Sequence, residues 1–187
     1  MDGYEYVSYE EFGRRFYEIA VTEKRVGDAI AAIAGDEFEM GPMAQGPGKI
    51  AKVTAKVRIQ EPRVERSVGE LITFAIRIPL EIDMVIDLRI DKPKFVVFGE
   101  ISLKAVARAA EPLLLILDVQ KPRPSDIAIH VTSKSLRAEL LRIVAGVDAE
   151  IRRFIAAHVA GEIDSPESVK AKVIDVAERL DAAWTGA

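Results

Sequence analysis

Residues 72–90, with the sequence ITFAIRIPLEIDMVIDLRI, carry an apolar side chain at every even position and a polar or charged one at most odd positions. A period of two residues is typical of a β-strand that buries one face. At about 3.3 Å per residue the stretch would span about 60 Å, whereas a compact domain of this length is about 40 Å across. We therefore expect the strand to bend or turn at Pro79, or to curl around the core. Either version leaves one continuous apolar face.

Three further segments alternate in the same way and predict antiparallel strands: residues 50–60, 95–109 and 127–131. A turn is expected at 91–94, and the turn before the central stretch fits either 61–63 or 67–69. Residues 113–117, LLLIL, are too few to span a membrane and suit a strand buried on both faces, with an exposed lipid-docking edge as the alternative. Residues 121–126 contain two prolines and predict a stiff turn.

Two helices are predicted ahead of the strands, within residues 8–35. Ser8 begins a capping box, and Thr22 is suited to cap a second helix that ends at Gly35. We interpret the aromatic residues of this terminus as a clamp onto the body of the protein; a role in gating a ligand or partner is the alternative. Residues 41–48 are rich in Gly and Pro but lack the Gly-Lys-Ser/Thr ending of a phosphate-binding loop, so we expect a connector.

A long amphipathic helix is predicted after the strands. Its apolar stripe runs over 136–163, about 42 Å at about 1.5 Å per residue, and Gly146 within it is a candidate kink. Ser165 and Pro166 form a strong start signal for a final helix that extends to Trp184.

Together these elements predict an α+β fold in one domain, residues 1–187. It consists of a helical N-terminal segment (8–35), a long, strongly curved antiparallel sheet (49–132), and C-terminal helices (134–184), with the sheet wrapped around or packed on the long helix. The chain has no cysteine, its net charge is −4, and it shows neither an export signal nor a membrane-spanning run. We therefore expect a cytoplasmic protein. Its basic residues are too sparse for nucleic-acid binding.

No catalytic or metal-binding constellation is predicted, and no cofactor. The two histidines, His130 and His158, lack ligand partners at metal-binding spacing and are interpreted as structural. Three carboxylates, Glu81, Asp83 and Asp87, could hold a divalent cation or act as an acid/base pair. They share the outward parity with arginines, which favours a salt-bridged outer face instead.

The order of elements from Gly48 to Ile163 resembles the tubular lipid-binding (TULIP) superfamily, in which a highly curved sheet rolls around a long helix and encloses a lipid. This resemblance is one of pattern and identifies no individual functional residue. The chain also resembles a conserved bacterial family, which implies no activity. A helix-grip lipid-binding fold is the nearest alternative, although it usually places helices between its first two strands.

These patterns suggest a non-catalytic carrier or sensor for an apolar small molecule or lipid, such as a fatty acyl or isoprenoid chain, held between sheet and long helix. The predicted binding residues are Ile72, Phe74, Ile76, Ile78, Leu80, Ile82, Met84, Leu115, Leu140, Ile143, Val147, Ile151 and Phe154. The alternative is a packed-core interaction module or homo-oligomer without a small-molecule ligand. Transient membrane contact and a homodimer are both compatible with the sequence.

Overall fold

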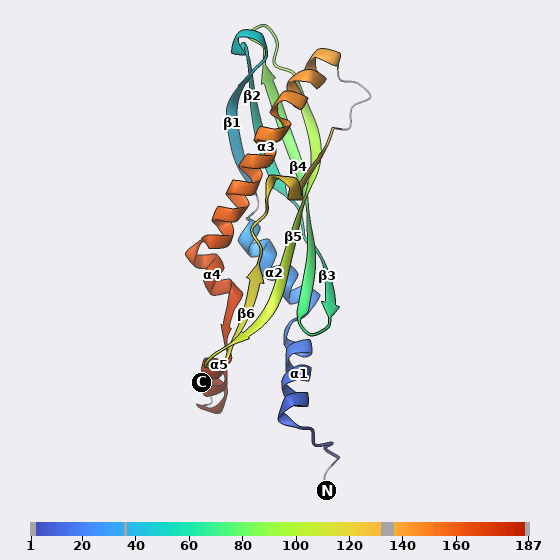
Figure 1. The fold of residues 1–187 in the computed structure, drawn as a ribbon. Helices are drawn as coiled ribbons and strands as arrows, with labels where there is room; N and C mark the ends of the chain where they lie inside the picture. Colours follow the sequence, from blue (N-terminus) through green and yellow to red (C-terminus); the bar gives the residue numbers. More distant parts are fainter. Residues whose placement is uncertain (1–2, 36, 132–136, 186–187) are drawn as a thin grey trace.

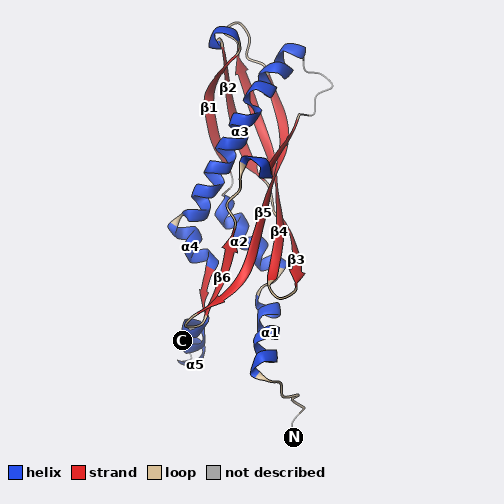
Figure 2. Cartoon of the chain, in the orientation of Figure 1, coloured by secondary structure: helices blue, strands red, loops and turns tan. Residues whose placement is uncertain are grey.

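The computed structural model describes residues 3–35, 37–131 and 137–185. It confirms the α+β class, with a curled antiparallel sheet and helices at both ends of the chain (Figures 1 and 2). The centre of the sheet is β4 (Ile72–Asp87) paired with β5 (Lys94–Ala110), in register from Ile72 opposite Ala107 to Val85 opposite Lys94. These long strands give the molecule its elongated shape.

The other edge of β4 is covered by two strands in succession, β2 (Ala51–Ile59) and β3 (Arg63–Val68). The chain therefore reverses its direction after Val68, at the second of the two expected turns. Residues 60–62 only interrupt the run of the chain along the edge of β4. Pro79 lies opposite this interruption, and its carbonyl accepts a hydrogen bond from the Gln60 N–H at 2.9 Å. A proline has no N–H to donate to a ladder, so the break between β2 and β3 accommodates it within one strand.

The far edge of β5 is likewise shared, by β6 (Leu114–Val119) and β7 (Ile127–His130). Between them lies the predicted stiff turn, which contains the short helix η2 (Pro124–Asp126). Leu115 and Leu117 of β6 are buried and Ile116 is half-buried, while Leu113 before the strand is 49% exposed. The apolar run is thus only partly covered on its outer side.

The Gly/Pro-rich segment expected as a connector is instead mostly strand. β1 (Glu37–Gln45) pairs with β2 as the edge of the sheet, followed by the short helix η1 (Pro47–Lys49). The register shifts between Met40 and Met43, so the bulge takes Gly41 and Pro42 out of the ladder. Gly41 has φ 103°, and a Cβ there would lie 2.6 Å from the Val53 carbonyl oxygen, which explains the glycine.

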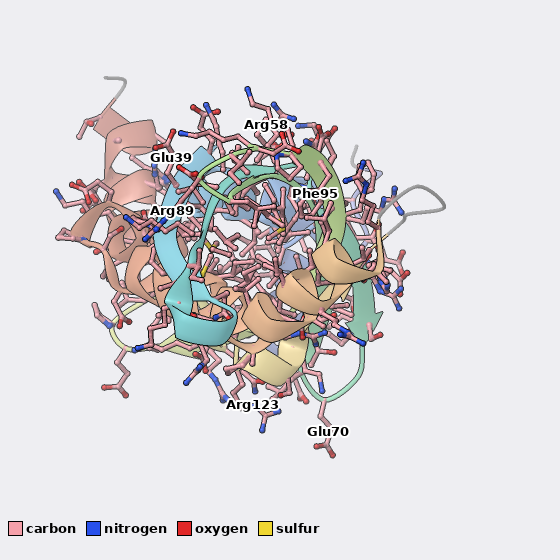
Figure 3. The ribbon with its side chains drawn as sticks, turned by 90° about the horizontal axis from the view of Figure 1, so that it is seen from above. Glu39, Arg58, Glu70, Arg89, Phe95 and Arg123 are labelled. Atoms are coloured by element: carbon pink, nitrogen blue, oxygen red, sulfur yellow. The ribbon has the colours of Figure 1, made fainter. Side chains whose placement is uncertain are left out.

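The long helix α3 (Ala138–Asp164) contacts β1, β7 and η2, and so spans the open side of the curled sheet. Seen from above, sheet and helix surround an interior filled with side chains (Figure 3). The helix continues through Gly146 without interruption. A Cβ at Gly146 would lie 2.9 Å from the Gln45 side-chain oxygen, and the glycine therefore permits close packing of α3 on β1.

The predicted final helix is interrupted. Ser165 caps α4 (Pro166–Lys172) as expected, but Val173–Asp175 form a short strand, β8, on the edge of β6 before α5 (Val176–Thr185). The chain at the end of β4 also differs from the prediction. The strand ends at Asp87, and Ile90, expected on the buried face, is 99% exposed.

The N-terminal helices α1 (Tyr9–Ala20) and α2 (Glu23–Ala34) begin where predicted, because Ser8 and Thr22 each accept a backbone hydrogen bond from the first turn. Val26, Ile30 and Ile33 of α2 belong to the core. The aromatic clamp was wrong for most of its members, which lie exposed: Tyr4, Tyr6, Tyr9 and Phe12.

Candidate functional site

The predicted binding residues lie inside the curled sheet, with one exception. All but Phe154 belong to the core or pack against it. Phe154 is 42% exposed and stacks on Phe38 of β1, with ring centroids 6.1 Å apart, outside the interior.

The interior next to β4 is filled by its own side chains. Every even position from Phe74 to Met84 is at most 2% exposed, and Val147 and Ile151 of α3 are equally buried. A cavity wide enough for an acyl chain would leave its walls accessible to a water-sized molecule, so these side chains pack against one another. A ligand between β4 and α3 would therefore have to displace packed side chains, and its binding there stays a prediction.

An open apolar groove lies at one end of this interior, between α1, the β3–β4 turn and the end of β5. We call it the α1 groove; its volume is about 340 Å³. Its lining includes Gly13, Tyr17, Leu71, Ile72, Ala107 and Ala109, together with the charged residues Arg14, Glu18 and Glu70. Ile72 is the one predicted binding residue that reaches it.

Helix α1 is held mainly at its C-terminal end. The Arg66 guanidinium donates hydrogen bonds to the carbonyl oxygens of Glu18, at 2.7 Å, and Val21, at 2.9 Å. The Arg66 backbone N–H donates to the Glu23 carboxylate at 2.9 Å. No residue of α1 is fully buried, and its N-terminal half extends away from the sheet (Figure 1). One wall of the groove is therefore a helix with few packing contacts to oppose its displacement.

Tyr17 supplies a polar group to this apolar setting. Its hydroxyl oxygen is buried and has no hydrogen-bond partner among the described residues. Burial raises the pKa of the Tyr17 phenol above its ordinary value, because the charged form loses hydration. An unsatisfied buried hydroxyl costs about 1–3 kcal/mol, so this group calls for an explanation.

The outer face of β4 is salt-bridged, as interpreted from the sequence. The Arg58 guanidinium pairs with the carboxylates of Glu81 and Asp83, in the latter case at 3.0 Å. Asp87 accepts a hydrogen bond from the Arg89 N–H and pairs with Lys92 at 3.0 Å, and these contacts lower the pKa of its carboxyl. The partners come from β2 and the β4–β5 turn, whereas the sequence pointed to arginines on β4 itself.

The histidines lie apart from each other. His130 is exposed at the end of β7, and the His158 ring stacks on Phe38 with centroids 3.9 Å apart. Within the described part of the chain, no three His, Asp or Glu side chains gather in a way that could hold a metal ion.

Sequence reasoning missed the α1 groove because three segments distant in sequence form it. Signals existed in the small inward residues at the end of β5 and in Gly13 on α1. Comparisons with known proteins add no family: no protein-family model matches the chain, and no curated protein matches it significantly. Of the helices in the described ranges, none is both long and apolar enough to cross a membrane.

Proposed function

We propose that the protein is a non-catalytic binding protein for an apolar ligand, such as a lipid with an acyl chain, and that the ligand occupies the α1 groove. The observation that carries the proposal is the unpartnered Tyr17 hydroxyl beside an apolar groove. The hydroxyl oxygen itself is buried, so a ligand reaches it only when α1 or the Tyr17 ring moves aside. A carbonyl or carboxylate oxygen of the ligand would then accept its hydrogen bond, and the apolar part would lie against Ile72 and Ala107.

The size of the groove fits part of a ligand. Its volume of about 340 Å³ is at the low end of ligand pockets, which run about 300–1,000 Å³. A longer chain would be accommodated by movement of α1, whose side chains are at most half-buried. The filled interior favours a second candidate, a packed-core interaction module without a small-molecule ligand.

Titration with a fluorescent fatty acid tests the proposal on two matched variants. Gly13→Leu adds a side chain to the groove wall, while Gly161→Leu makes the same change on α3. A Cβ at either glycine meets no atom within 4 Å, so both variants should fold. We expect Gly13→Leu to lose binding about tenfold or more and Gly161→Leu to bind like the wild type.

Tyr17→Phe separates a ligand contact from a structural role. Removing the hydroxyl should weaken fatty-acid binding by about 2–13-fold, as expected for one hydrogen bond of about 0.5–1.5 kcal/mol. It should not lower the stability of the ligand-free protein, because the hydroxyl bonds none of the residues that the structure describes. Absence of any acyl-chain binding by the wild type would favour the second candidate.

A further inference from the structure

A second groove, of about 410 Å³, lies where the chain between β6 and β7 leaves the sheet. The pairing of β5 with β6 ends at Ala105 and that with β7 ends at Ile101, so Ser102 and Lys104 lie beside a gap in the sheet edge. Both side chains are exposed, on the outward parity of β5. Segment 120–126 forms the opposite wall.

Four of the five charged residues that line the groove are bases. Arg77 and Lys104 come from the two central strands, and Lys121 and Arg123 come from segment 120–126. Figure 3 shows Arg123 on the outside of the ring that sheet and helix form. One acid, Asp126, also lines the groove. We call this the basic groove; it shares no lining residue with the α1 groove.

Of these four bases, two form ion pairs with carboxylates and two do not. Lys121 pairs with Asp164 at 2.5 Å, and Arg123 pairs with Asp126 at 3.5 Å. Within the described ranges, no salt bridge involves Arg77 or Lys104. On the same face of the sheet, Arg58 has two carboxylate partners. The acids diagonal to Arg77 in the strand register, Glu65 and Glu100, form no ion pair with it.

The neighbour of Arg77 across the sheet is also a base. Arg63 of β3 lies directly opposite it in the register, and both side chains are exposed. Like charges directly opposite each other destabilise a strand pair. An anion bound at Arg77 would offset this repulsion.

The wall formed by segment 120–126 is stiff. Pro122 and Pro124 restrict the backbone, and the Asp126 carboxylate accepts a hydrogen bond from the Arg123 N–H at 2.8 Å. That hydrogen bond lowers the pKa of Asp126, and the Arg123 side chain and the positive charge of Lys104 lower it further. Segment 120–126 is thus held by ion pairs and hydrogen bonds in which the side chains of Arg77 and Lys104 take no part.

We propose that the basic groove binds the phosphate group of a small anionic ligand, through Arg77 and Lys104, with the Ser102 hydroxyl as a further donor. A guanidinium binds phosphate through two parallel N–H groups, and an ammonium adds a point charge. The phosphate could belong to a soluble ester or to a lipid headgroup, since both present the same oxygens. This site is independent of the proposed apolar-ligand function.

Isothermal titration with glycerol phosphate, and co-sedimentation with phosphatidylcholine vesicles that contain phosphatidic acid, distinguish the two sources. The variants are Arg77→Gln and Lys104→Gln, both at exposed positions. The matched control is Lys94→Gln, an exposed position of the same strand and parity, ten residues or about 33 Å away.

We expect binding of at least one probe, a loss of about tenfold or more in each groove variant, and no change in Lys94→Gln. If the protein binds the vesicles but not glycerol phosphate, and the groove variants lose that binding, the ligand is a lipid headgroup. If it binds glycerol phosphate, the ligand is a soluble ester. The proposal is overturned if neither probe binds, or if Lys94→Gln weakens binding as much as the groove variants. A thermal-unfolding measurement without ligand should show Arg77→Gln at least as stable as the wild type, because it removes the repulsion from Arg63.

Discussion

Replacement of Ile78 by alanine tests whether the protein fills its own interior. Ile78 is fully buried at the middle of β4, within the apolar row that the sequence suggested as a ligand surface. Truncation of a packed isoleucine removes its transfer free energy and leaves a cavity, which together cost about 2–5 kcal/mol. That is a large part of the about 5–15 kcal/mol that stabilises a typical fold, and it corresponds to a fall in Tm of about 4–20 °C.

Urea denaturation, followed by circular dichroism, measures this cost as a free energy of unfolding. Ile90→Ala is the control, because it makes the same change at a side chain that is 99% exposed and should alter stability by no more than about 0.5 kcal/mol. If Ile78→Ala were as mild as Ile90→Ala, Ile78 would line open space, and the account of a packed interior would fail.

Two further predictions concern close packing and charge. Gly99→Ala would place a Cβ 2.8 Å from the Ala128 carbonyl oxygen and should cost about 1–3 kcal/mol in urea denaturation, whereas Gly69→Ala, with 3.9 Å to its nearest atom, should cost about 0.5 kcal/mol or less. Hydrogen bonds from arginines on α1 lower the pKa of Glu11 from 4.5 to about 2, so its contribution to α1 is present above about pH 4.5 and is lost as the pH falls toward 2. An NMR titration of its carboxyl carbon with a midpoint near 4.5 would contradict this.

The strands and helix starts were predictable because their signals are local. The alternation in 72–87 and the caps at Ser8, Thr22 and Ser165 each depend on neighbouring residues only. β1 was missed because its glycine and proline, Gly41 and Pro42, resemble a loop, and only pairing with β2 and the bulge at the sheet edge make it a strand.

Other misses have the same origin in tertiary contacts. Val173–Asp175 continue a helical pattern, yet the free edge of β6 recruits them as β8. Ile90 continues the alternation of β4, but the chain turns after Asp87 and leaves it in solvent. The two grooves likewise depend on which segments the fold brings together. The sequence alone therefore indicated the apolar face of the sheet but neither groove.

Native mass spectrometry of the freshly purified protein tests the central proposal, an apolar ligand in the α1 groove, most directly. We expect the wild type and Gly161→Leu to carry the additional mass of a bound lipid, which organic extraction releases, and Gly13→Leu to lack it. A wild type that carries no additional mass, even after incubation with a fatty acid, would contradict the proposal, as would an equal bound mass on Gly13→Leu.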